Sequence, residues 1–142
     1  MNVPNPLLIA AAFLSGIAAL LHVGILLFGP SWYRFFGAGK RMVNLAETGS
    51  WIPTFVTLCI IAVLSTWALY AVAAAGGVID LPLQKLAPII ITAIYLLRGV
   101  AVLPALALLH KKITPFWLWS SAICTLYGVV HLAGLLQRWS AL

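Results

Sequence analysis

The sequence predicts an all-α fold, a four-helix transmembrane bundle with a short interfacial helix between spans one and two. Three observations support this prediction. Of the 142 residues, 64% are hydrophobic and 7% are charged, whereas roughly 25% of the residues in a soluble domain are charged. Four stretches are long and apolar enough to supply the roughly 20 helical residues that cross a bilayer. Helix breakers, such as Gly29-Pro30 and Gly76-Gly77, separate these stretches.

The four predicted spans cover residues 7–28, 51–75, 86–109 and 116–137. The first, second and fourth contain no Lys, Arg, Asp or Glu, and the third contains only Arg98. This is typical of spans, because a charge is costly in hydrocarbon. No basic segment precedes the first span, whereas a secretory signal has one before its apolar core. We therefore expect this span to be retained. Residues 1–142 are therefore predicted to form a single integral membrane domain.

The linker between the first two spans, residues 29–50, is longer than the 2 to 8 residues that usually connect bundle helices. We therefore expect it to contain structure of its own. The segment KRMVNLAE, at 40–47, predicts about two turns of interfacial helix with apolar residues toward the lipid or the bundle and charges toward water. Such a helix would bring Glu47 toward the mouth of the bundle.

Lysine and arginine predict the orientation. Five of them fall in the linkers that follow spans one and three, and two lie on the opposite side: Arg34, Lys40, Arg41, Lys111 and Lys112, against Lys85 and Arg138. The four spans predict a multi-pass protein of the cell (inner) membrane. Because cytoplasmic loops carry the excess of positive charge, we expect the linkers after spans one and three to face the cytoplasm. Both termini are then predicted to be non-cytoplasmic.

Several function classes are disfavoured by what the sequence contains. Its charged residues form no basic face, so we expect no nucleic-acid partner. Cys59 and Cys124 are 65 positions apart and make no metal-binding motif, so no metal is predicted. Glu47 and Asp80 are predicted on opposite sides of the membrane, which rules out a catalytic carboxylate pair. No catalytic residue is predicted, and a non-enzymatic protein is favoured.

Arg98 is the most informative residue because it lies about eleven residues inside span three, on the order of 16 Å deep. No acidic residue lies within any span, so its partner could be Glu47, Asp80, the nearby Tyr95, backbone carbonyls freed by Pro104, or a ligand anion. Two interpretations stay open. The arginine either ties helices together or anchors an anionic ligand or lipid head group.

Span four carries polar and small residues at spacings of three and four, which places them on one helix face: Ser120, Cys124, Tyr127, His131 and Gly134. Tyr127 is predicted at the same depth as Arg98, since each is some eleven residues from the cytoplasmic end of its span. We therefore expect Arg98, Tyr127 and His131 to meet in the bundle centre. The alternative is that this face serves close helix packing and interhelical hydrogen bonds.

His22 and His131 raise the possibility of a haem b held between two imidazoles. By their positions in spans one and four they differ in depth by roughly 13 Å, whereas two axial ligands must lie at nearly one level. No cofactor is therefore predicted. A haem b remains the alternative. It would need a dimer interface to bring two histidines to the same level.

The candidate ligand-binding residues are Arg98, Tyr95, Tyr127, His131, His22 and Glu47. The predicted function is a small polytopic membrane protein that binds or moves a lipid, a quinone or an anionic small molecule through an intramembrane polar pocket around Arg98. The alternative is an accessory or structural subunit of a larger membrane complex, with a haem-binding or membrane-enzyme role ranked last. Expected partners are membrane lipids, an anionic or quinone-like ligand, and a second copy of the chain or a larger membrane complex.

Overall fold

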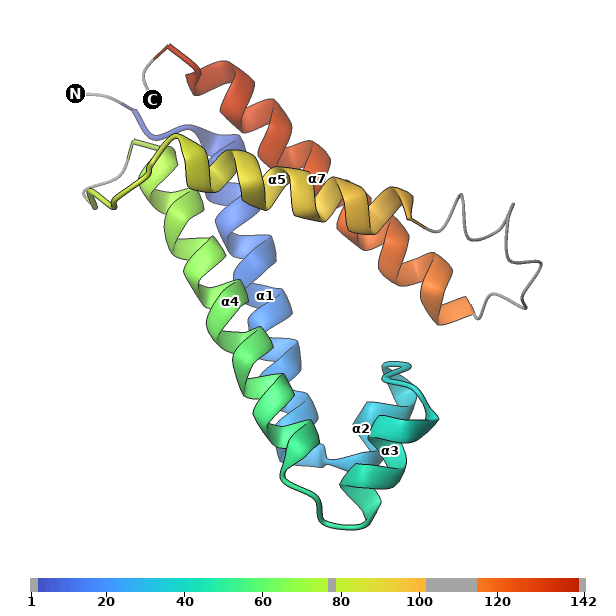
Figure 1. Cartoon of the computed structure of the whole chain (residues 1–142). Helices are drawn as coiled ribbons and strands as arrows, with labels where there is room; N and C mark the ends of the chain where they lie inside the picture. The colour runs from blue at the N-terminus through green and yellow to red at the C-terminus, as the bar shows by residue number, and fades with distance from the viewer. Residues whose placement is uncertain (1–2, 77–78, 102–114, 141–142) are drawn as a thin grey trace. The chain divides into compact units, whose positions relative to one another are not determined.

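The computed structural model describes residues 3–76, 79–101 and 115–140. Within these ranges the chain is all-helical and contains no strand. Six helices are described (Figure 1): α1 Pro6–Phe28, α2 Pro30–Phe35, α3 Lys40–Glu47, α4 Ile52–Ala74, α5 Leu86–Val100 and α7 Pro115–Arg138.

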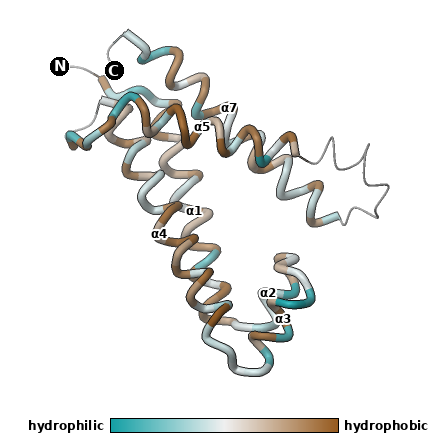
Figure 2. Tube along the Cα trace, in the orientation of Figure 1, coloured by the Kyte–Doolittle hydropathy of each residue, from teal (hydrophilic) through white to brown (hydrophobic). Residues whose placement is uncertain are grey.

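Three helices, α1, α4 and α7, are long and apolar enough to cross a membrane, and their apolar character is visible in Figure 2. They match the predicted spans at 7–28, 51–75 and 116–137, which supports a membrane-embedded protein. The span predicted at 86–109 is confirmed only in part. It begins with α5, an apolar helix of 15 residues, and residues 102–109 lie outside the described residues. The prediction of four spans is therefore not confirmed.

The linker after α1 contains two short helices. The helix predicted at 40–47 is confirmed as α3, with the bounds Lys40–Glu47, whereas α2 was not predicted. Gly29 separates α1 from α2 with a φ of 65°, a left-handed conformation that favours glycine. Pro30 then opens α2, because a proline at the first position of a helix has no N–H to leave unpaired.

The chain divides into two compact units, and each is described here by itself. The first comprises the residues up to 15 and those from 67 onward, and the second comprises residues 16–66. The division falls within α1 and α4, so each of these helices contributes one segment to each unit. The first unit therefore contains the start of α1, the end of α4, and the whole of α5 and α7.

Two glycines bring α5 and α7 into close contact in the first unit. A Cβ added to Gly99 would lie 2.7 Å from the backbone nitrogen of Thr125 and 2.9 Å from its Cα. A Cβ on Gly128 would lie 2.7 Å from the Leu96 side chain and 3.0 Å from the Leu96 backbone nitrogen. Both contacts need a residue without a side chain. Small residues of this kind allow the backbones of membrane helices to approach closely.

Asn5 fixes the start of α1 against the ends of α4 and α7. Its Oδ1 accepts hydrogen bonds from the backbone N–H groups of Leu7 and Leu8, both at 3.0 Å, as a helix N-cap does. Its own N–H donates to the carbonyl of Ala75 at 2.8 Å, and its Nδ2 donates to Oε1 of Gln137 at 2.8 Å. Three helix ends are therefore joined through the backbone and side chain of one buried residue.

The second unit has its own small core, in which Ile25, Tyr33 and Val43 are buried. Tyr33 anchors α2 to α4, because its hydroxyl lies 2.8 Å from Oγ1 of Thr57. The Thr57 hydroxyl donates to the carbonyl of Pro53 at 2.8 Å, which leaves its oxygen free to accept from Tyr33. The apolar side of α3 thus packs against α1 and α2 through Val43.

Candidate functional site

A buried aromatic cluster in the first unit brings together side chains from α1, α4, α5 and α7. Tyr95 lies at its centre and is 5% exposed. Its hydroxyl is 3.0 Å from Oγ of Ser15. Its ring centroid lies 4.9 Å from that of Trp67, 5.5 Å from Tyr127 and 5.2 Å from His131. We call these five residues the Tyr95 cluster.

His131 is a deeply buried polar member of the Tyr95 cluster, with 1% of its surface exposed. Its Nδ1 lies 2.8 Å from the backbone carbonyl of Tyr127, one turn earlier on α7. Because a carbonyl oxygen only accepts hydrogen bonds, Nδ1 must carry the hydrogen. In the neutral ring Nε2 is then an acceptor. This nitrogen is buried and has no hydrogen-bond partner in the part of the chain that the structure describes.

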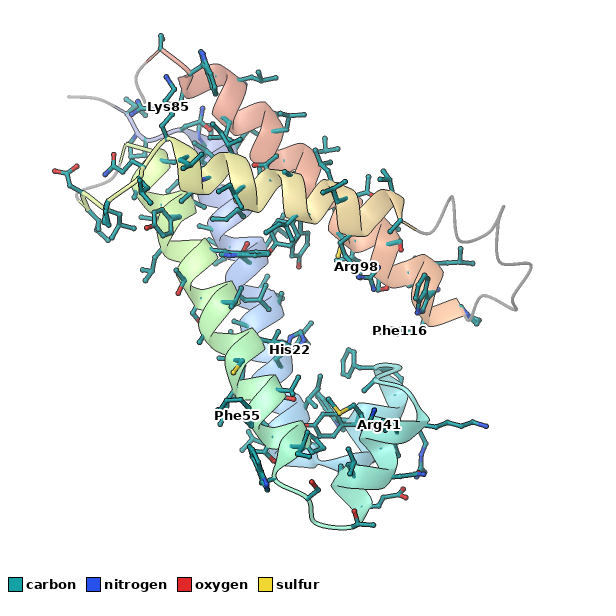
Figure 3. The ribbon with its side chains drawn as sticks, viewed as in Figure 1. His22, Arg41, Phe55, Lys85, Arg98 and Phe116 are labelled. Carbon is teal, nitrogen blue, oxygen red and sulfur yellow. The ribbon has the colours of Figure 1, made fainter. Side chains whose placement is uncertain are left out.

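Arg98 forms a separate polar group between the end of α5 and the beginning of α7 (Figure 3). Its Nη1 donates to Oγ of Ser121 at 3.4 Å and its Nη2 to Oγ of Ser120 at 3.2 Å. The guanidinium carbon lies 5.6 Å from the centre of the Trp117 ring, within the range of a cation–π contact. We call Arg98, Ser120, Ser121 and Trp117 the arginine group. The side chain of Arg98 is exposed on the protein surface.

The two acidic residues of the chain have hydrogen-bond partners of their own. Glu47 forms a salt bridge with Arg34, and Asp80 accepts a hydrogen bond from Gln84 Nε2 at 3.3 Å. Tyr95 makes its hydrogen bond to Ser15 instead. Pro104, proposed to free a backbone carbonyl, lies outside the described residues. Within those residues, the polar contacts of the Arg98 charge are therefore to neutral hydroxyl groups.

The expected meeting of Arg98 with Tyr127 and His131 needs correction. Tyr127 and His131 do come together, but around Tyr95. The predicted register of the two helices was nearly right, because Gly99 lies against Thr125. The error arose from the length of the arginine side chain. It extends along α7 toward the start of that helix, where it reaches Ser120 and Ser121.

His22 and Glu47 belong to the second unit. His22 is half-buried, and its Nδ1 lies 2.8 Å from the carbonyl of Ala18, the same i to i−4 contact that His131 makes. Glu47 is exposed at the end of α3, and its carboxylate is engaged by Arg34 on α2. These contacts account for both side chains locally. The difference in depth between the two histidines stays a prediction.

Four residues of these sites were missed by sequence reasoning: Ser15, Trp67, Trp117 and Ser121. Two of them carried a usable signal. Trp67 is a tryptophan far from the ends of its predicted span, where interfacial tryptophans are expected. Ser15 is the only hydroxyl residue in its predicted span, and a hydroxyl in hydrocarbon needs a partner. Ser121 has no such signal, because it falls outside the spacing of three and four that places Ser120 on the polar face of span four.

The described residues contain no group of three or more His, Cys, Asp or Glu side chains that could hold a metal ion. Cys59 and Cys124 are both free thiols. Comparison of the chain with models of protein families, with curated proteins and with solved structures finds no match. The function has to be inferred from the two groups of residues described above.

Proposed function

We propose that this protein is a four-span integral membrane protein that binds the anionic head group of a lipid at Arg98. The observation that carries the proposal is the chemistry around the guanidinium. The guanidinium carries a full positive charge and lies on an apolar helix. Among the described residues, its hydrogen bonds go to two serine hydroxyls. Neither hydroxyl neutralises the charge. An anion supplied by the membrane would do so.

The arginine group has the donors that a phosphate or carboxylate requires. Guanidinium offers five N–H groups in a planar fork that matches these anions with two parallel hydrogen bonds. The hydroxyl of Ser121 can turn to donate to the same anion, because a hydroxyl both donates and accepts. The hydroxyl of Ser120 donates to the carbonyl of Trp117 at 3.2 Å and would exchange that bond for one to the anion. Trp117 lies beside them near the start of α7, and tryptophan is enriched at the level of lipid head groups.

The membrane arrangement that goes with this proposal is the predicted one of four spans, in which α5 begins the third span and α7 forms the fourth. The loops rich in lysine and arginine, at 29–50 and 110–115, then face the cytoplasm, and both termini face the other side. In this arrangement the start of α7 lies at the cytoplasmic boundary of the membrane. The arginine group would therefore meet head groups of the cytoplasmic leaflet.

The test is retention of an anionic lipid by purified protein. Wild-type protein in detergent is titrated with phosphatidylglycerol or with phosphatidylethanolamine, and bound lipid is counted by native mass spectrometry. We expect Arg98→Gln to weaken phosphatidylglycerol binding by about tenfold to a hundredfold, since hydrogen bonds to charged groups contribute about 1.5–3 kcal/mol. Binding of the zwitterionic lipid should change less.

Arg41 provides the matched control. It is an exposed arginine on α3 (Figure 3), and Arg41→Gln removes the same charge from the protein. If both variants lose phosphatidylglycerol equally, the attraction depends on net charge and no site exists at Arg98. Unchanged binding in Arg98→Gln would also overturn the proposal, and it would favour an arginine that only ties α5 to α7.

A further inference from the structure

His131 presents an unpaired hydrogen-bond acceptor inside the Tyr95 cluster. The exposed fraction of this residue is 1%, and its Nε2 is enclosed without a hydrogen-bond partner among the described residues. Buried polar atoms nearly always have a partner, either in the protein or in an ordered water molecule. This nitrogen is therefore a place where a ligand atom would be stabilised.

The chemistry of that ligand atom follows from the tautomer of His131. The bond from Nδ1 to the Tyr127 carbonyl holds the hydrogen on Nδ1, so Nε2 offers a lone pair. A lone pair attracts an O–H or N–H donor and repels a carbonyl oxygen or an anion. The site therefore selects against the quinone and anion classes that the sequence suggested. It favours a group that carries a hydrogen.

The surroundings indicate what kind of molecule carries that hydrogen. The Tyr95 ring packs against His131 with centroids 5.2 Å apart, and Trp67 and Tyr127 pack edge-on against Tyr95 at 4.9 Å and 5.5 Å. A ligand that reaches Nε2 has to part these rings. An aromatic ligand replaces the lost contacts with contacts of the same kind, because aromatic rings pair favourably at these separations.

We infer that the Tyr95 cluster is a binding site for a lipid-soluble phenol or hydroquinone, whose hydroxyl donates its hydrogen bond to Nε2 of His131. This site is separate from the arginine group and needs no anion. On α5 it uses Tyr95, which precedes Arg98. On α7 it uses Tyr127 and His131, which follow Ser120 and Ser121. A bound water molecule would satisfy the same nitrogen, so the experiment must tell the two apart.

The first experiment uses wild-type protein in lipid nanodiscs and needs no variant. The nitrogens of histidine are labelled with ¹⁵N, and the Nε2 resonance of His131 is followed during titration with 4-butylphenol or with its methyl ether, 4-butylanisole. The two probes share ring and chain, and only the phenol has a hydrogen to donate. We expect saturable binding of the phenol with a shift of the Nε2 resonance, and no such shift with the ether.

Two results of that experiment would overturn the inference. One is a shift of equal size with both probes, since the hydroxyl would then contribute nothing. The other is an Nε2 resonance that already has the shift of a hydrogen-bonded nitrogen without any probe and does not respond to the phenol. The site would then hold water only.

The second experiment locates the binding with a matched pair of variants. His131→Phe keeps an aromatic ring and removes the acceptor, while His22→Phe changes the other span histidine, which is only half-buried. We expect 4-butylphenol to bind about three- to tenfold more weakly to His131→Phe, which corresponds to the loss of one hydrogen bond, and normally to His22→Phe. Equal affinity in the two variants contradicts the assignment. If His131→Phe does not fold, the comparison of phenol and ether on the wild-type protein decides.

Discussion

The hydroxyl of Tyr95 lies 3.0 Å from the hydroxyl of Ser15, a residue 80 positions earlier in the chain. This bond connects α5 to the first half of α1 inside the first unit. Ser15 is fully buried and Tyr95 is 5% exposed, so water cannot satisfy either group. A buried hydroxyl without a partner is costly in an apolar interior. The pair therefore favours the arrangement of helices in which the two hydroxyls meet.

The first prediction concerns this pair. Tyr95→Phe and Ser15→Ala should each lower the free energy of unfolding by about 1 kcal/mol, because each leaves one buried hydroxyl unpaired. The double variant should lose less than the sum of the two. We expect a coupling of about 0.6 kcal/mol, typical of hydrogen bonds between membrane helices. Unfolding in sodium dodecyl sulphate, followed by circular dichroism, measures all four proteins, and strictly additive losses would show that the bond contributes nothing.

The second prediction concerns the contact between α5 and α7. Gly99→Ala should lower the free energy of unfolding by about 1–3 kcal/mol, the usual cost of overpacking. The new methyl group would meet backbone atoms of Thr125 at 2.7 Å and 2.9 Å, and a backbone cannot rotate out of the way. Gly128→Ala should cost less, since part of its clash is with the flexible side chain of Leu96.

Gly16 provides the control for the glycine variants. It lies within α1, and a Cβ added there would have no atom within 4 Å. Gly16→Ala should therefore be neutral or stabilising by about 0.5–1 kcal/mol, because alanine is the better helix former. A loss of stability in Gly16→Ala equal to that in Gly99→Ala would mean that the close packing of α5 and α7 is not the cause.

Much of the fold could be predicted because helices of this kind are determined by the pattern of apolar and charged residues along the sequence. Long uncharged stretches identify α1, α4 and α7, and the amphipathic pattern of KRMVNLAE identifies α3. The buried side of α7 also follows from spacing, since Tyr127, His131 and Gly134 are all buried. Helix α2 could not be found in this way. Its six residues are held by a distant contact, the bond from Tyr33 to Thr57.

The candidate site was predicted less well because it depends on contacts between helices. Counting residues from the span ends gave a register between α5 and α7 close to the observed one. It could not show that Tyr95 faces inward while Arg98 is exposed, since both lie on one helix three residues apart. It also could not show that the arginine side chain reaches Ser120 and Ser121, because that depends on its rotamer.

The third prediction concerns the start of α1. Asn5→Ala should lower the free energy of unfolding by about 0.5–2 kcal/mol through loss of the helix cap alone, and by more because the bond to Gln137 is lost as well. Asn5→Asp keeps the acceptor that caps Leu7 and Leu8 and removes only the donor to Gln137. It should therefore lie between Asn5→Ala and the wild type. Equal losses in the two variants would mean that the cap has no effect.

The last prediction concerns orientation and rests on the five positive charges of the loops after spans one and three against two on the other side. In a variant that lacks Cys59 and Cys124, single cysteines are introduced as Asn2→Cys, Lys112→Cys and Leu142→Cys. Intact cells are then treated with a thiol reagent that does not cross the membrane. Cysteines at positions 2 and 142 should react, and the one at 112 should react only after the cells are opened. Reaction at 112 alone would indicate the opposite orientation, and the arginine group would then meet the other leaflet. Reaction at all three positions would mean that the protein inserts in both directions, because a bias of five charges to two is then too small to decide the outcome.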